Sequence, residues 1–503
     1  MLTTSTPTTT VLPARRRWAA LAVLSTAVLL LAIDGTVLAL AVPALTVDLA
    51  PTAEQVLWIG DVYSLTLAGL LVLMGNLADR FGRKRVLLLG SAAFGAVSLA
   101  AAFATSAETL IAARLLLGVA GATLMPSTLS LIRNLFPDDT ERARAIAIWS
   151  TAFGAGSAIG PLTGGVLLEH FWWGSVFLIN VPVMILLLIS GHLLLPESRD
   201  PEPGRFDVLS AGLSMAAIVP LVFAVKHVVG HGLDAVTAGC LLAGMTAGVL
   251  FVRRQRRLDQ PMLDVELFRS PAFSGAVAAN VIAIFALTGL LFFFSQYLQL
   301  ARAHSPLQAG LAELPATIAS IAVIALIGVA VTRLGRGRAI ALGMATAAAG
   351  LALVAAAAHG PYLWLGLALA PIGLGIGLAM TLTGDAIVSA APPRKAGSVS
   401  AITETANELG VVLGIAVLGS LVTLVYRSEV DVPSGLTAED ATRVRDSLGP
   451  ALQVLEPGSA AAAGARDAFI TGMQVTSVVA AILTAVAAIV AWRLIPSPRA
   501  TRP

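Results

Sequence analysis

Apolar stretches long enough to cross a lipid bilayer recur along this chain from end to end, separated by short charged segments. A transmembrane helix needs about 20 predominantly apolar residues. Of the 503 residues, 57% are hydrophobic and 12% are charged, whereas an ordinary soluble domain carries about 25% charged residues. The sequence therefore predicts an all-α polytopic membrane protein, and it excludes a disordered chain, a collagen-like repeat or an ordinary soluble enzyme.

Hydropathy predicts about fourteen transmembrane helices. The expected spans are 18–42, 56–78, 86–104, 108–131, 143–167, 174–195, 207–229, 235–252, 272–299, 307–331, 339–358, 361–384, 397–425 and 469–494. The first span follows three arginines but has no small-residue cleavage pattern, so we expect it to be retained rather than removed as a signal peptide. The single cysteine, Cys240, excludes an internal disulfide.

Basic residues gather in alternate loops. Of the 32 Lys and Arg residues, 25 fall on one side, which the positive-inside rule makes cytoplasmic together with both termini. Lys226 and five arginines are assigned to the opposite side, where the longest loop, 426–468, is expected to be external. Because the cations lie in loops between spans and not on one soluble face, we expect no nucleic-acid partner.

One segment repeats within the chain. Residues 79–85 align with residues 332–338, and Gly75 and Gly90 align with Gly328 and Gly343. The repeat predicts two six-helix halves, 18–195 and 272–494, joined by a linker, 196–271, that carries two extra helices. A cytoplasmic N-terminus (1–17) and tail (495–503) complete the division; the alternative is two unrelated basic turns.

A single carboxylate, Asp34, stands in the middle of the first apolar span. A charge at this depth costs about 2.5–3.5 kcal/mol on insertion scales, and such residues are usually functional. Because an apolar environment disfavours the charged form of an acid, Asp34 is a candidate for proton exchange. A structural hydrogen bond to a neighbouring helix is the alternative.

Two further groups are candidates for recognising a cation. Asp61 lies near the expected external end of the second span, where a side chain that reaches the interface lowers the free-energy cost of a charge. Trp58 and Tyr63 are close to it in the sequence; they could offer aromatic faces to a cation or lie in the aromatic belt at the interface. Glu404 and Glu408, four residues apart, share one face of the thirteenth span. We expect this pair to line a cavity that attracts a lipophilic cation, the alternative being a structural contact between helices.

One basic residue, Arg114, is placed deep in a span and needs an acidic or carbonyl partner, for which Asp34 is the first candidate; a static ion pair is the alternative. Glu313 and Asp385 are expected at the membrane interfaces. The histidines lack metal-ligand spacing, and no phosphate-binding or nucleophile motif occurs, so we expect no metal, no cofactor other than protons, and no enzymatic activity.

Taken together, these motifs resemble those of the major facilitator superfamily, in its fourteen-helix drug:proton antiporter branch. The resemblance rests on residues 75–84 for the loop between spans 2 and 3, residues 160–165 for span 5, residues 32–37 for span 1 and Arg114 for span 4. Residues 177–182 and 261–265 are also similar to that branch. It is nearest to bacterial quaternary-ammonium and dye exporters and to their actinobacterial relatives.

The resemblance implies roles for individual residues. Asp34 with Arg114 would couple protons, and Asp61, Glu404 and Glu408 would bind substrate. Gating would involve Gly75, Asp79, Arg80, Gly82, Arg83, Gly160, Pro161, Gly164 and Gly165. Exporters of bivalent cations carry two further acids where Ser320 and Thr403 stand here, which favours monovalent substrates.

We therefore predict a monomeric exporter of lipophilic, mostly cationic drugs in the bacterial inner membrane, driven by protons. A dedicated exporter of one antibiotic would use the same mechanism. A membrane-embedded enzyme, a sensor and a proton-coupled importer are the rival classes, and the span 5 glycines argue against the importer.

Overall fold

A computed structural model describes residues 13–199, 207–259, 261–390 and 396–497 of the chain. Within these ranges the regular structure is helical, and 13 helices are long and apolar enough to cross a membrane, with one bent pair as a fourteenth span. The predicted all-α membrane fold is confirmed. Most of the expected tails (1–17 and 495–503) and the basic residues Arg205, Arg394 and Lys395 lie outside the described residues.

The first six spans form one helical bundle. They are α1 (Ala14–Leu49), α2 (Ala53–Phe81), α3 (Arg83–Ala102), α4 (Ala107–Leu135), α5 (Asp139–His170), and a sixth span made of α6 (Ser175–Leu178) and α7 (Asn180–Leu194). In this bundle α1 packs on α5, α2 packs on α4, and α3 packs on α7.

The last six spans repeat this arrangement. They are α10 (Pro271–Gln296) with the π-helix η2 (Tyr297–Ala301); α11 (Pro306–Ala312), α12 (Leu314–Ala322) and α13 (Ile324–Leu334) as one broken span; α14 (Arg336–Ala357); α15 (Tyr362–Ser389); α16 (Ala396–Leu413) with the π-helix η4 (Gly414–Leu418) and α17 (Gly419–Glu429); and α20 (Ala460–Leu494). Here α10 packs on α16, α12 on α15, and α14 on α20, which is the pairing order of the first bundle.

The aligned basic turns are equivalent in three dimensions as well. Gly82 separates α2 from α3 with φ +111°, and Gly335 separates α13 from α14 with φ +78°. Residues with a Cβ rarely adopt such angles, so both turns require glycine. This shared requirement favours a true internal repeat over two unrelated turns.

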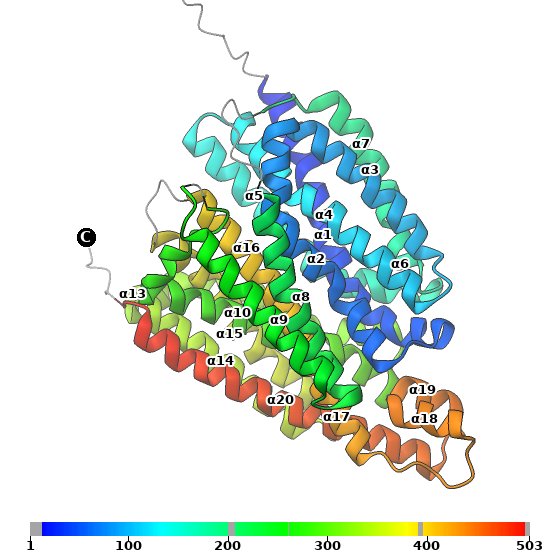
Figure 1. Cartoon of the computed structure of the whole chain (residues 1–503). Coiled ribbons are helices and arrows are strands. Elements are labelled where there is room, and N and C mark those ends of the chain that lie inside the picture. The colour runs from blue at the N-terminus through cyan, green and yellow to red at the C-terminus, as the bar shows by residue number, and fades with distance from the viewer. Residues whose placement is uncertain (1–12, 200–206, 260, 391–395, 498–503) are drawn as a thin grey trace, which may run out of the picture.

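Two extra helices, α8 (Val208–His231) and α9 (Ala235–Gln255), form a hairpin between the halves, and the short 3₁₀ helix η1 (Val265–Arg269) follows them. Figure 1 shows this hairpin in green where the blue first half meets the yellow and red second half. At its turn, the backbone N–H of Thr237 and the His227 side chain lower the pKa of Asp234 to about 2. The helix α8 packs on α2 from one half and on η4 and α17 from the other.

One prediction is wrong at this hairpin, the place of Lys226 in an external loop. Lys226 lies inside α8, and its side chain is fully buried. The residue falls within the predicted span 207–229, so the apolar window was right and the loop assignment was wrong. A buried ammonium group needs a partner inside the protein.

The tenth span is broken, with a bend of 49° between its segment Pro306–Ala322 and α13. Glu313 lies at the junction of α11 and α12 and is only 4% exposed. Its side chain is therefore packed inside the protein, and its expected place near an interface stays a prediction. Asp385 pairs with Arg336 at 2.8 Å and is more than half exposed.

The predicted external loop 426–468 is largely helical. The helix α17 continues to Glu429 and α20 begins at Ala460, because the Ser459 side chain accepts a hydrogen bond from the Ala462 N–H and caps that helix. Between them, residues 430–459, which we call the strap, contain α18 (Ala438–Asp446) and α19 (Leu448–Val454). Figure 1 shows the strap at the opposite end of the bundle from the last turn of α20; we call these the strap end and the terminal end.

We predict that the crossing of α14 and α15 depends on glycine. A Cβ on Gly375 would stand 2.3 Å from the carbonyl oxygen of Gly343, so Gly375→Ala must push the two helices apart. Overpacking of this kind costs about 1–3 kcal/mol. The melting temperature of the purified protein should fall by several degrees.

Gly384→Ala on the same helix is the control, because its Cβ would meet no atom within 4 Å. Equal melting temperatures for the two variants would contradict the assigned role of Gly375.

Candidate functional site

Asp34 of α1 lies at the centre of a buried polar cluster. Its Oδ2 accepts a hydrogen bond from Nη1 of Arg114 on α4 at 3.2 Å, and its Oδ1 accepts one from Nδ2 of Asn180 on α7 at 2.7 Å. The side chains of Asp34 and Arg114 are 1% and 2% exposed. The contact that the sequence suggested between these two residues is present, while Asn180 was missed as a partner, although it is the polar residue of the quoted segment 177–182.

Arg114 joins this cluster to α2. Its Nε donates to the carbonyl oxygen of Ile59 at 3.2 Å, and its guanidinium lies 4.7 Å from the centre of the Tyr63 ring. A buried guanidinium is tolerated when an acid, a carbonyl and an aromatic face share its charge. The charge of Arg114 is therefore compensated by groups on two helices, α1 and α2.

A second buried ion pair lies on the neighbouring face of α2. Nζ of Lys226 is 2.6 Å from Oδ1 of Asp61, and both side chains are 0% exposed. The same ammonium lies 3.5 Å from the centre of the Trp58 ring. The expectation that Asp61 snorkels to an interface is wrong, and Trp58 faces a cation that the protein itself supplies.

Glu404 and Glu408 on α16 are half-buried and share one face, as their spacing predicts. Ser64 of α2 is a hydrogen-bonding neighbour of Glu408. Within the described residues, no ion pair is formed by either glutamate. The pair is therefore the least compensated acidic group among the predicted site residues.

Amide and hydroxyl groups continue from this pair to other helices of the second half. Nδ2 of Asn407 lies 3.5 Å from Oε2 of Glu404, and Oδ1 of Asn407 accepts from Nδ2 of Asn280 on α10 at 2.7 Å. Thr383 of α15 donates to Asn280 at 3.1 Å. Neutral partners stabilise this face without cancelling its negative charge.

The predicted gating residues at the terminal end contact one another within the first half. Arg83, the first residue of α3, pairs with Asp79 of α2 at 2.7 Å, and Gly82 forms the turn between the two helices. Glu197, which sequence reasoning missed, accepts the backbone N–H groups of Lys84 and Arg85 at 3.1 and 3.2 Å and so caps α3. Arg80 lies over the exposed Phe81 ring; Gly75 contacts Pro126 of α4.

The span 5 glycines are positions of close helix packing. A Cβ on Gly160 or Gly164 would collide with α1, at Thr36 and Val37 respectively. A Cβ on Gly165 would stand 2.9 Å from Cα of Leu307, and Gly310 approaches the carbonyl oxygen of Pro161 in the same way. The segment thus brings α5 against α1 and against α11 of the other half.

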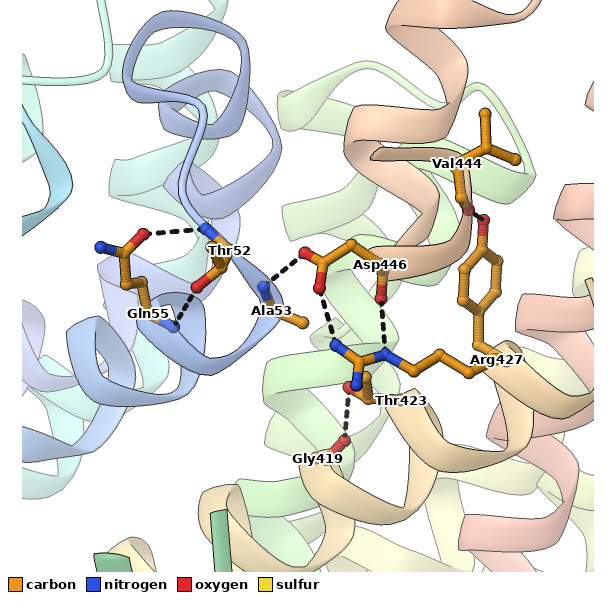
Figure 2. Close-up of polar contacts among 9 residues, drawn as sticks. Thr52, Ala53, Gln55, Gly419, Thr423, Arg427, Val444 and Asp446 are labelled. Carbon is orange, nitrogen blue, oxygen red and sulfur yellow. Dashed lines mark hydrogen bonds and ion pairs between the residues drawn. The ribbon is translucent and has the colours of Figure 1, made fainter. Parts of the chain in front are cut away.

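The strap joins the two halves at its own end of the bundle. Figure 2 shows Asp446 between the first turn of α2 and the guanidinium of Arg427. Its Oδ2 accepts the N–H of Ala53 at 2.7 Å, and its Oδ1 lies 2.7 Å from Nη2 of Arg427 on α17. Gln453 also donates to the carbonyl oxygen of Thr46 at 3.1 Å. The strap end is therefore closed in this conformation.

We predict that Asp446→Ala loosens this closure. The Ala53 N–H belongs to the unpaired first turn of α2, so Asp446 is the acceptor that protects it. Loss of a hydrogen bond to a charged group costs about 1.5–3 kcal/mol, which corresponds to roughly tenfold to hundredfold faster amide exchange. Hydrogen–deuterium exchange of peptides covering residue 53 measures this directly.

Glu439→Ala is the matched control, since Glu439 is an exposed acid on the same helix, α18. Unchanged exchange at residue 53 in Asp446→Ala would show that the strap does not hold α2.

Among the described residues, no three His, Cys, Asp or Glu side chains lie close enough together to hold a metal ion. Three charged residues, Arg114, Lys226 and Glu408, instead meet one stretch of α2, residues 58–64. Arg114 contacts it at Ile59 and Tyr63, Lys226 at Trp58 and Asp61, and Glu408 at Ser64.

Comparison with known proteins places this geometry in context. Residues 24–415 match the sequence profile of the Major Facilitator Superfamily. The chain is 48% identical to the multidrug efflux pump LfrA of Mycolicibacterium smegmatis, over 96% of this chain and 97% of that protein. It is 36% identical to the methyl viologen resistance protein SmvA of Salmonella typhimurium, over 90% and 93% of the two chains.

A third relative is the tetracenomycin C resistance and export protein of Streptomyces glaucescens, 34% identical over 81% of this chain and 76% of that one. Among solved structures, a bacterial homologue of the lysosomal transporter Spinster, in an inward-facing and unoccupied conformation, aligns with a TM-score of 0.67 at 16% identity, covering 97% of this chain and 100% of that chain. At this identity the structural likeness shows the shared fold alone.

Proposed function

Because this chain belongs to the major facilitator superfamily and is a membrane transporter rather than an enzyme, we propose that it exports drugs in exchange for protons. The observation that carries the proposal is the buried cluster of Asp34, Arg114 and Asn180. When a buried carboxylate bonds to groups on other helices, a change in its protonation changes how strongly those helices are held together. The relatives named for drug resistance and efflux support drugs as the cargo.

The contacts suggest how a proton acts on the transporter. In the ionised state Asp34 binds α4 and α7 to α1. A proton on the carboxylate cancels its attraction to Arg114, which then retains the Ile59 carbonyl and the Tyr63 ring on α2. The preferred position of α1 relative to α2 and α4 therefore differs between the two protonation states, as coupling requires.

Substrate recognition is assigned to the face of α16. Glu404 and Glu408 carry negative charge that no ion pair in the described residues offsets, so a monovalent lipophilic cation would be attracted there. The basic loops favour an orientation in a bacterial inner membrane with the terminal end facing the cytoplasm. A drug would then enter from the terminal end while the strap end is closed. A monomer contains all of these groups.

The driving force suffices for concentrative export. A pH difference supplies about 1.4 kcal/mol per unit, so one proton per drug molecule supports roughly a tenfold gradient for each pH unit. A membrane potential adds about 2.3 kcal/mol per charge for each 100 mV when the exchange moves net charge, as with neutral cargo or with two protons per monovalent cation.

We predict that Asp34→Asn abolishes proton-driven efflux while the protein still inserts in the membrane. Asparagine cannot exchange a proton, and it leaves the Arg114 charge without its counter-ion, at a cost of about 3–5 kcal/mol. Drug-triggered proton movement in inverted vesicles measures the loss.

Asp385→Asn is the control, because Asp385 is also paired with an arginine but is more than half exposed; we expect near-normal efflux from it. Undiminished active efflux by Asp34→Asn would refute the coupling role.

We also predict that Glu408→Gln selectively lowers resistance to cationic drugs. The substitution removes the charge but keeps a side chain that can bond with Ser64, so neutral compounds should still be exported. A resistance panel of cations and neutral antibiotics tests this, with the exposed Glu429→Gln as control. If Glu408→Gln lost resistance to cationic and neutral compounds alike, cation recognition at Glu408 would be contradicted. If the wild-type protein conferred resistance to a single antibiotic, a dedicated exporter would be favoured.

A further inference from the structure

Lys226 is a cation that the protein places against an acid and an aromatic ring. Its ammonium lies 2.6 Å from Asp61 and 3.5 Å from the centre of the Trp58 ring, with no exposure of either charged side chain. A carboxylate beside the face of a tryptophan is the pair of groups that binds an organic cation in water-poor surroundings. The site formed by Asp61 and Trp58 is thus chemically a cation site, and an internal amine fills it.

The ion pair is incompletely satisfied for a purely structural bridge. Oδ2 of Asp61 is buried and has no hydrogen-bond partner among the described residues. Buried ion pairs stabilise a fold only when their remaining lone pairs are also bonded, and a pair with an unbonded oxygen is costly to keep. The carboxylate of Asp34 differs, since both of its oxygens accept hydrogen bonds, and the unbonded buried atom beside it is the neutral amide oxygen of Asn180.

The amine comes from an element outside both halves. Val222 of α8 packs in a small apolar cluster with Leu65 of α2 and with Val412 and Ala416 of the second half. Asp61 and Trp58, in contrast, both lie on α2. Withdrawal of Lys226 therefore needs a shift of α8 at the seam, and it does not require either six-helix bundle to unfold.

From these contacts we infer that Lys226 is a built-in competitor of the cargo, occupying an Asp61–Trp58 site that a monovalent lipophilic cation takes during export. This inference rests on the proposed drug efflux and adds a specificity-determining residue to it. An entering cation displaces the ammonium from Asp61, and the return of Lys226 expels the cation. Neutral cargo has no charge with which to displace the ammonium.

The first test is binding of tetraphenylphosphonium to the purified full-length protein, measured by calorimetry. Lys226→Met removes the competitor, so we expect affinity to rise at least tenfold, whereas Lys226→Arg keeps the cation and should not raise it. In the double variant Asp61→Asn/Lys226→Met the gain should vanish, because no carboxylate is left. A folded Lys226→Met protein without tighter binding, or a gain that survives in the double variant, overturns the inference.

The second test uses the wild-type protein, so it does not depend on the folding of a variant. The chain has three lysines, Lys84, Lys226 and Lys395, which makes labelling by an amine-reactive ester easy to follow by mass spectrometry. Saturating tetraphenylphosphonium should raise labelling of Lys226 severalfold and leave that of Lys84, in the basic turn, unchanged. Unchanged or reduced labelling of Lys226, or no binding of the cation to any variant, overturns the proposal.

The two proposals fail in distinguishable ways. If Lys226 is not displaced while proton-driven efflux continues in vesicles, only the competitor role is lost. If efflux does not depend on protons, the proposed function fails whatever Lys226 does.

Discussion

Titratable side chains buried among apolar transmembrane helices are the constraint on which this structure depends. Each one must find compensation inside the protein or remain close to a polar cavity. Asp34 accepts hydrogen bonds from the guanidinium of Arg114 and the amide of Asn180, on two other helices. Asp61 pairs with the ammonium of Lys226 on the linker hairpin. Glu404 and Glu408 form no ion pair among the described residues, lie beside each other and beside neutral polar groups, and retain partial exposure. Three degrees of compensation therefore exist within one molecule, and in the proposed mechanism they suit three different tasks.

The stretch 58–64 of α2 connects these charges. Successive residues of a helix point in different directions, so Ile59 and Tyr63 reach the Arg114 cluster while Asp61 faces α8 and Ser64 faces α16. A small rotation or shift of this stretch alters all three environments together. In the proposed mechanism, this shared contact transmits protonation of Asp34 to the groups that bind cargo, since packed cores adopt discrete arrangements and do not deform continuously.

The sequence predicted the features that depend on local patterns. The apolar windows gave the number of spans, the repeat gave the equivalent turns at Gly82 and Gly335, and the isolated charge of Asp34 marked its burial. Features that depend on distant partners were missed. The contact between Lys226 and Asp61 was missed because the two residues are far apart in the chain. The burial of Lys226 was missed because one lysine changes the mean hydropathy of an apolar span very little. The helix break at Glu313 was missed because a hydropathy window does not register a bend, and the strap helices were missed because short helices, such as the capped α18, need little hydrophobicity.

The backbone symmetry of the two halves contrasts with the asymmetry of their charges. Helices pair in the same order in both halves, yet the ion-paired acids Asp34 and Asp61 lie in the first half, whereas Glu404 and Glu408, which form no ion pair among the described residues, lie in the second. In the proposed mechanism, an acid that exchanges protons has to discriminate between two packed states, which suits the tightly bonded Asp34. An acid that binds varied cargo needs partners that are weak or displaceable, as the neutral neighbours of Glu404 and the ammonium of Lys226 beside Asp61 would be. Because these groups lie on both halves, one rocking motion would change their environments together.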